Sequence, residues 1–178
     1  MKKKKFIILT VAMLSVLICA VSVTFAWIIA MSNEVENTFT VGDVSISLDE
    51  STGTVYKLTP GTTLQKDPTV TVRAGSDSCW LFVKVDRSSN FDEFLSFSTE
   101  DGWTALSGES DVYYREVEAT DTDVCFSVLK NDHIRVRDSV TEQQLAALDS
   151  NPAISFTAYA IQHSGISTAE SAWNELLG

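Results

Sequence analysis

Short segments in which apolar and polar residues alternate dominate this chain, and such alternation is typical of strands with one buried face. Residues 43–48 alternate in this way, and residues 153–162 do so over a longer stretch. Residues 79–86 differ, because both faces are apolar at the start, which predicts a central strand covered on both sides. Further strands are predicted at 37–41, 54–58, 69–73, 112–117 and 124–129, and another is predicted to begin at Trp103.

Turn and cap residues separate these segments. Pro60-Gly61 predicts a tight turn, and residues 119–123 predict a hairpin-like loop between two strands. Ser139 to Glu142 and Ser167 to Glu170 each fit a capping box, in which a Ser hydroxyl and a Glu carboxylate satisfy free N–H groups at a helix start. One helix is therefore expected to run to Leu148 and another to lie at the C-terminus. The pattern at 88–108 leaves helix and strand open.

Many short strands at intervals of roughly 8–12 residues, with few helices, predict a single mainly β domain built as a sandwich. No long linker, low-complexity tract or repeat of solenoid period interrupts the sequence. Aromatic residues are spread over the predicted strands and the last helix, as a sandwich core requires. They are Trp80, Phe82, Trp103, Tyr113, Phe126, Phe156 and Trp173.

A basic and then apolar N-terminus precedes this domain. Lys2 to Lys5 are followed by an apolar run from Phe6 to Met31, the pattern of a secretory signal. Small Thr24 and Ala26 occupy the −3 and −1 positions of a cleavage site between Ala26 and Trp27.

Two alternatives to this cleavage site stay open. Cleavage between Ala30 and Met31 is the second choice, because bulky Ile28 would then occupy the −3 position. An uncleaved anchor is the other, since the run to Met31 exceeds the roughly 20 residues that cross a bilayer. The small residues and the strand that follows closely favour cleavage. The expected organisation is a signal peptide at 1–26 (or an anchor helix to 31), an N-terminal segment at 27–42 and a sandwich domain at 43–178.

The net charge of the cleaved chain limits the classes of partner that it is expected to bind. Removing residues 1–26 takes four of the 13 basic residues and none of the 24 acidic ones, which leaves a formal net charge of −15. Because nucleic acids and anionic lipid surfaces are bound mainly through Lys and Arg, neither is an expected partner. The membrane is expected to be contacted during export only.

Two cysteines, Cys79 and Cys125, remain after cleavage. An exported protein can keep a disulfide, and this pair is the one intramolecular choice. However, Cys79 shares a strand face with Leu81, whereas Cys125 lies opposite the apolar face of Val124 and Phe126. A disulfide and two separate thiols both stay open.

Catalytic and metal-binding signals are weak. His133 and His163 are the two histidines, no H-E-x-x-H is present, and a catalytic zinc usually takes three protein ligands. G-x-S-x-G, P-loop and G-x-G-x-x-G motifs are also absent from the sequence. No cofactor is expected. Ca²⁺ is the one candidate ion, through the loop carboxylates of Asp121-Thr122-Asp123 or Asp49-Glu50, although neither pair fits an EF-hand loop.

Several short motifs follow one another along the chain. They are Phe25-Ala26-Trp27, Asn37-Thr38-Phe39-Thr40-Val41-Gly42-Asp43-Val44, Tyr56-Lys57-Leu58-Thr59-Pro60-Gly61, Lys66-Asp67-Pro68-Thr69-Val70-Thr71-Val72, Tyr159-Ala160-Ile161-Gln162 and Ala172-Trp173. In this order, over most of the chain beyond the signal, they resemble the TasA/camelysin family of exported Gram-positive proteins.

The resemblance implies a jelly-roll-like antiparallel β-sandwich, here with one or two short helices, that is processed by a dedicated signal peptidase. It implies assembly into extracellular fibres of a biofilm matrix, in which each subunit donates its N-terminal segment to the sheet of a neighbour. It also implies an alternative activity, that of a camelysin-type surface metallopeptidase, for which this chain has no recognisable signature.

The residues support strand donation independently. The segment Asn37, Thr38, Phe39, Thr40 and Val41 is β-like and lies just after the cleavage site. An open sheet edge can accept such a strand through main-chain hydrogen bonds, with Phe39 and Val41 filling pockets. Because such a head-to-tail contact does not close on itself, it propagates as a filament.

The expected function is therefore that of a secreted subunit, at or outside the surface of a Gram-positive cell, whose partners are copies of itself and a signal peptidase. No enzymatic activity is expected. A metallopeptidase and a membrane-anchored adhesin that keeps residues 6–31 are the alternatives.

Overall fold

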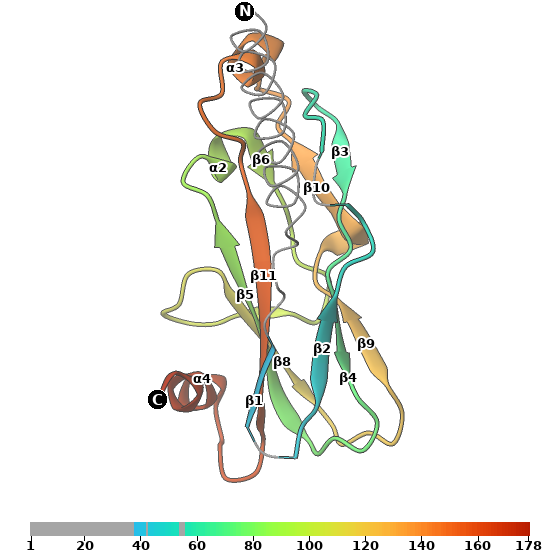
Figure 1. The fold of residues 1–178 in the computed structure, drawn as a ribbon. Helices are drawn as coiled ribbons and strands as arrows, with labels where there is room; N and C mark the ends of the chain where they lie inside the picture. Colours follow the sequence, from blue (N-terminus) through green and yellow to red (C-terminus); the bar gives the residue numbers. More distant parts are fainter. Residues whose placement is uncertain (1–37, 42, 54–55) are drawn as a thin grey trace, which may run out of the picture. The chain divides into compact units, whose positions relative to one another are not determined.

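The structure is a computed structural model that describes residues 38–41, 43–53 and 56–178 (Figure 1). These residues belong to the unit Val35–Gly178. In chain order the elements are β1 (Thr38–Val41), β2 (Ile46–Asp49), β3 (Thr63–Gln65), β4 (Thr69–Val72), β5 (Cys79–Arg87), α2 (Phe91–Phe94), β6 (Leu95–Ser96), β7 (Thr104–Ala105), β8 (Val112–Val117), β9 (Val124–Ser127), the 3₁₀ turn η1 (Lys130–Asp132), β10 (His133–Val136), α3 (Glu142–Ala146), β11 (Ile154–Gln162) and α4 (Ala169–Leu177).

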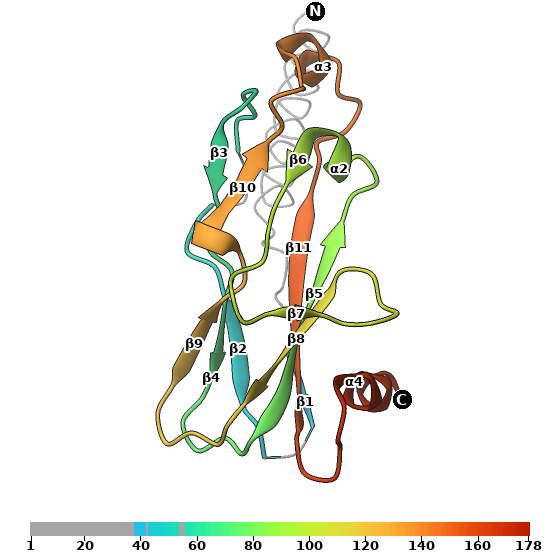
Figure 2. The ribbon, with the colours of Figure 1, turned by 180° about the vertical axis from the view of Figure 1, so that it is seen from behind.

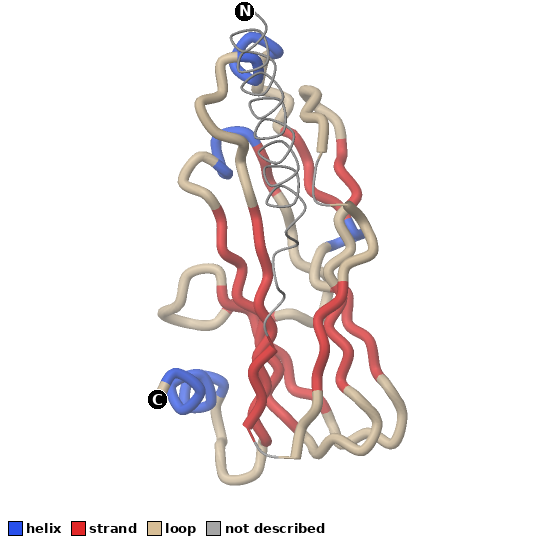
Figure 3. Tube along the Cα trace, viewed as in Figure 1, coloured by secondary structure: helices blue, strands red, loops and turns tan. Residues whose placement is uncertain are grey.

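The strands form three sheets. The largest has five strands in the order β1-β11-β5-β8-β7, and two smaller sheets have the orders β2-β4-β9 and β3-β10-β6. Every strand pair in the described residues is antiparallel except β1 with β11, which is parallel. Figure 3 shows how strongly strands predominate over helices. The predicted mainly β class is confirmed, although the described residues contain three α-helices rather than one or two.

The largest sheet is buried on both faces. One face packs against the two smaller sheets around fully buried residues that include Val70, Leu81 and Ala158. Its other face packs against α4, where Trp173 lies 5.2 Å from the Phe82 ring. Figures 1 and 2 show α4 on the side of this sheet away from β2, β4 and β9. The prediction that residues 79–86 form a central strand covered on both sides is therefore confirmed.

Other predictions are confirmed where local pattern and packing agree. Strands β4, β5, β8 and β11 lie where alternation predicts them. The Pro60-Gly61 turn is also present, with the Thr62 N–H donating to the Thr59 carbonyl over 3.2 Å and Gly61 at a φ of +72°. Only glycine adopts that φ at little cost.

Two predictions are wrong, and one strand was missed. The described part of the 54–58 segment is not a strand, and β3 begins only after the turn, at Thr63. Residues 119–123 do not close a hairpin, because β8 pairs with β5 and β7 while β9 pairs with β4 in another sheet. Strand β10 was not predicted at all, and it joins β3 to β6.

Both capping boxes are misplaced by one or two residues. Thr141 rather than Ser139 caps α3, and it pairs with Gln144 in a reciprocal capping box. The side chain of Val140 is buried in the core, so residue 140 precedes the helix and the cap falls on the next residue. Similarly, the hydroxyl of Thr168 rather than Ser167 caps α4 and accepts from the Ser171 N–H.

Arg115 of β8 ties the largest sheet to the β2-β4-β9 sheet. Its guanidinium carbon lies 4.0 Å from the ring centroid of Phe126 in β9 and 5.2 Å from that of Trp103. The Trp103 indole N–H also donates to the Ser127 carbonyl over 2.8 Å. Burial lowers the pKa of Arg115, and the stacked rings supply the attraction that a carboxylate would otherwise provide.

Asp67 organises the loop that follows β2. Its carboxylate accepts hydrogen bonds from the N–H and hydroxyl groups of Ser51 and Thr52. These bonds, of which the one from the Ser51 hydroxyl is the strongest, lower the pKa of Asp67 to about 2. Next to it, Lys66 Nζ lies 2.7 Å from Glu50 Oε1, and both side chains are largely buried.

We predict that Asp67 makes the folded state sensitive to acid. Because its pKa is lower in the folded than in the unfolded chain, its contribution is complete above the unfolded value of about 3.9 and is lost as the pH falls towards 2. Asp67→Asn should therefore be less stable than the parent at pH 6, and the difference should shrink below pH 4. Urea unfolding across this pH range measures it. Exposed Asp121→Asn is the control, and an Asp67→Asn penalty that stays constant with pH would contradict the prediction.

Gly102 gives a second test, of the contact between the sheets. A Cβ at Gly102 would lie 2.7 Å from Arg115 Nη2, and Arg115 is held between two rings. Gly108 has a similar positive φ with open space around it. We expect Gly108→Ala to cost about 1 kcal/mol from backbone strain alone and Gly102→Ala about 2–3 kcal/mol. Equal losses in urea unfolding would show that Arg115 moves aside freely.

Candidate functional site: the β1 edge of the largest sheet

Strand β1 occupies one edge of the five-stranded sheet. It runs parallel to β11, with Thr38 opposite Ala158, Phe39 opposite Tyr159, Thr40 opposite Ala160 and Val41 opposite Ile161. Four of the five residues in the predicted donor segment are thus in a strand, and Asn37 lies outside the described residues. In this chain the segment is paired with its own sheet, so the strand that the sequence predicts to be donated already has a partner within the same molecule.

The acceptor strand β11 is held independently of β1. On its other side it pairs with β5 over all nine of its residues. Beyond its end, Gln162 Nε2 donates to Asp77 Oδ2 over 2.7 Å and the His163 N–H donates to the Ser78 carbonyl over 2.8 Å. Loss of β1 would therefore leave the acceptor strand in place.

The two faces of β11 pack against different layers of the domain. Ala158 and Ala160 are fully buried in the core between the sheets, where small side chains allow close packing. Ile161 belongs to the cluster under α4, and Tyr159 packs edge-on against Trp173 at 5.2 Å. The acceptor edge is therefore bordered by a packed layer on each side.

Strand β1 covers only part of this edge. It pairs with the last residues of β11 before Gln162, and no strand in the described ranges pairs with residues 154–157 on that side. Sheet edges with free N–H and C=O groups are templates for added strands. The edge is thus long enough for a donated strand that is longer than β1.

The chain is anchored firmly just after β1. Buried Ser76 accepts a hydrogen bond from the Ser45 N–H over 3.1 Å and lies 3.3 Å from the Ser45 carbonyl, to which its hydroxyl donates. The Arg73 N–H donates to the Ser45 carbonyl, and the Asp77 N–H donates to the Asp43 carbonyl. Between β1 and this anchor lies one residue, Gly42, outside the described residues.

The anchor was missed from the sequence, where Ser76 and Asp77 appear only as turn residues. Nothing in a turn motif reveals that a serine is buried against a segment 31 residues earlier. A small polar residue flanked by two strong strands was the one available signal.

Neither cysteine finds a disulfide partner. Cys79 is buried in β5 and Cys125 is exposed in β9, and both are free thiols. Burial raises the pKa of Cys79 to about 11, which keeps it protonated and unreactive at neutral pH. Cys125 Sγ lies 3.4 Å from the Thr71 hydroxyl. Of the two alternatives that the sequence left open, the one with two separate thiols agrees with the structure.

The candidate metal ligands are dispersed. His133 lies in β10, whereas the His163 ring stacks on Trp80 at 5.0 Å, with Nε2 3.6 Å from Glu116 Oε1. A hydrogen bond from the Ala74 N–H, and after it the ion pair with Arg73 at 2.8 Å, lower the pKa of Asp123. In the described ranges, no three His, Cys, Asp or Glu side chains are grouped so that they could hold a metal ion.

The N-terminal predictions fall outside the part of the chain that the structure describes. This holds for the run from Phe6 to Met31 and for both cleavage sites, Ala26-Trp27 and Ala30-Met31. Among the described helices, none is long and apolar enough to cross a membrane. No family model, curated protein or solved structure matches this chain.

We predict that the Ser76 hydroxyl stabilises the anchor after β1. Ser76→Ala leaves the Ser45 N–H without its partner, so the free energy of unfolding should fall by about 1–2 kcal/mol. Ser78→Ala, two residues away, is the control, because the Ser78 hydroxyl has no hydrogen-bond partner within the described residues. Urea unfolding of both variants measures the effect, and equal stabilities would contradict it.

Proposed function

We propose that this chain is an exported structural subunit that polymerises outside the cell by donating its segment Asn37–Val41 to the five-stranded sheet of a neighbouring copy. One observation carries the proposal: β1 is an edge strand that has β11 as its one strand partner among the described residues. An identical β11 in a second copy offers the same hydrogen bonds. Exchange therefore replaces one pairing by an equivalent pairing in another molecule.

Three features around β1 support its exchange between copies of the chain over its permanent insertion in its own sheet. The segment is short, so few hydrogen bonds hold it in place. It precedes an anchor at Asp43 and Ser45 that does not depend on it. Its acceptor β11 keeps its β5 partner when β1 leaves. These features lower the free-energy cost of releasing β1 without unfolding the domain.

The N-terminal sequence supplies a reason for assembly outside the cell. While residues 6–31 stay in the membrane, β1 is tethered to it, and cleavage after Ala26 would free the segment. The further proposals that go with this function are a jelly-roll-like sandwich, processing by a dedicated signal peptidase and residence in a Gram-positive biofilm matrix. They are supported by the resemblance of the motifs at 25–27, 37–44 and 66–72 to the TasA/camelysin family.

A protein that begins at Gly42 provides the decisive test. It keeps β11 but lacks β1, so it should fold, form no fibres alone and accept a strand from an intact subunit. Because it has no strand to pass on, it should end each fibre that it joins. We predict that small amounts, mixed with protein that begins at Trp27, shorten the fibres in proportion to the amount added. Fibre length is measured by electron microscopy, and the fold of the truncated protein by circular dichroism.

A peptide of residues 34–42 serves as the control. Incubated beforehand with the truncated protein, it should occupy the β11 edge and abolish the shortening of fibres. Truncated protein that folds and yet forms fibres of normal length would rule out strand donation. An intact-mass measurement of the exported protein separates the fibre subunit from an anchored adhesin, because it reports whether residues 1–26 are present.

A further inference from the structure

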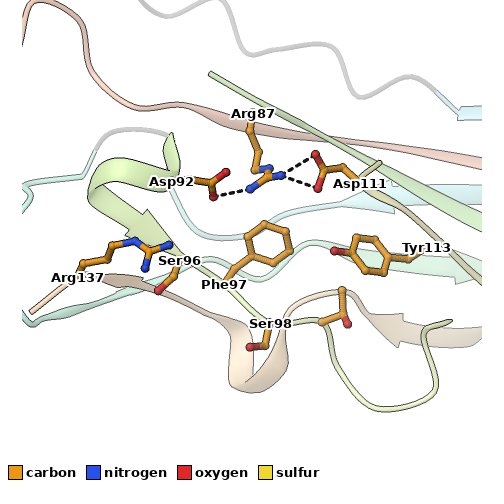
Figure 4. Close-up of a pocket in the computed structure, with 9 residues that line it drawn as sticks. Arg87, Asp92, Ser96, Phe97, Ser98, Asp111, Tyr113 and Arg137 are labelled. Carbon is orange, nitrogen blue, oxygen red and sulfur yellow. Dashed lines mark hydrogen bonds and ion pairs between the residues drawn. The ribbon is translucent and has the colours of Figure 1, made fainter. Parts of the chain in front are cut away.

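A polar cavity lies at the other end of the β5–β11 ladder from β1. Arg87 at the end of β5 is opposite Ile154, whereas β1 pairs with β11 only from Ala158 onwards. The cavity has a volume of about 440 Å³ and is built from several separate segments (Figure 4). It is lined by Arg87, Asp92, Ser96, Phe97, Ser98, Thr99, Asp111, Tyr113 and Arg137. A volume of this size suits a small-molecule ligand.

The terminal nitrogens of Arg87 bind two carboxylates in one wall of the cavity. Its Nη2 lies 2.7 Å from both carboxylate oxygens of Asp111, and its Nη1 donates to Asp92. The guanidinium also lies 5.8 Å from the ring centroids of Phe91 and Phe97. Asp111 is held at a positive φ of 63°, with its carbonyl accepting from the Val85 N–H over 2.8 Å. These contacts fix two carboxylates at the cavity, and Arg87 offsets one of their two negative charges.

Arg137 differs from Arg87, because its charge has no partner. Its Nε donates to the Leu95 carbonyl over 3.1 Å, which fixes the direction of the side chain. Its terminal nitrogens make no ion pair or hydrogen bond with any described residue. Figure 4 shows its guanidinium beside Ser96, on the same side of the cavity as Asp92. A half-buried, oriented cation that has no ion-pair partner among the described residues can bind a carboxylate or another small anion.

Hydroxyl groups complete the lining. The side-chain hydroxyls of Ser96, Ser98, Thr99 and Tyr113 have no hydrogen-bond partner among the described residues. Each can both donate and accept, and the Asp92 and Asp111 oxygens keep further acceptor capacity. The rings of Phe97 and Tyr113 add apolar surface. Hydroxyls, paired carboxylates and aromatic rings together match the alternating polar groups and C–H faces of a sugar.

We propose that the cavity between Arg87 and Arg137 binds a sugar that carries a carboxylate, that is, a uronic acid, either free or as a unit of a polysaccharide. The ligand carboxylate lies at Arg137, and its ring hydroxyls lie at the serine, tyrosine and aspartate side chains. A neutral sugar lacks the contact with Arg137, and a simple carboxylate lacks the contacts with the hydroxyls. The site does not depend on strand donation, because it lies at the end of the ladder away from β1.

Titration of the full-length chain in detergent with D-glucuronate, D-glucose and acetate, followed by protein NMR, tests the proposal. Glucuronate should bind about tenfold more tightly than either comparator, the difference expected for one charge-assisted contact. The shifted resonances should be those of residues 96–99, 111–113 and 137. Equal affinity for glucuronate and glucose, or shifts elsewhere on the protein, would overturn it.

Two variants show which groups are responsible. Arg137→Gln should reduce the affinity for glucuronate to that for glucose. Its matched control Arg135→Gln, at an exposed position of β10, should leave both affinities unchanged. Tyr113→Phe removes a hydroxyl without a partner, so the fold is kept, and the affinity for both sugars should fall by about threefold. Unchanged binding of glucuronate to Arg137→Gln would refute the assignment.

A glucuronate-containing disaccharide distinguishes a polysaccharide ligand from the free sugar acid. Binding as tight as that of glucuronate indicates a unit of a polysaccharide, and loss of binding indicates the free acid.

Discussion

The antiparallel pairing of β5 with β11 is the constraint on which the rest of this domain depends. Nine residues of each strand are in register, and apolar side chains on both faces of the pair are withdrawn from water. One face forms the core with the two smaller sheets and the other is covered by α4. Burial of this kind contributes about 25 cal/mol for each Å² of apolar surface, so a ladder buried on both faces outweighs any single polar contact in the domain.

The two functional proposals use opposite ends of this ladder. At one end β11 accepts β1 on its outer edge, and the anchor at Ser45 and Ser76 fixes where the chain leaves the sheet. At the other end, Arg87 is the last residue of β5 and lines the polar cavity. Because β11 keeps its pairing with β5 when β1 leaves, the proposed exchange of the edge strand would not disturb the cavity. A matrix fibre built in this way would carry one sugar site in each subunit.

Polar groups tie the layers together where apolar packing ends. Arg115 reaches from β8 to the aromatic rings of Trp103 and Phe126, and Asp67 and Lys66 order the loop after β2. Such contacts contribute less to stability than the core does, yet they decide how the sheets are placed against each other.

What the amino-acid sequence determined by itself was the set of strands and their buried faces. Alternation locates β4, β5, β8 and β11, because a period of two in hydrophobicity is a local property of any half-buried strand. It also marks Asn37–Val41 as β-like. The tertiary structure alone decided which strands pair: the separation of β8 from β9, the parallel pairing of β1 with β11, and the meeting of Arg87, Asp111 and Arg137 at one cavity. These depend on contacts between residues far apart in sequence, whose free energy arises only when whole sheets pack, so no local pattern records them.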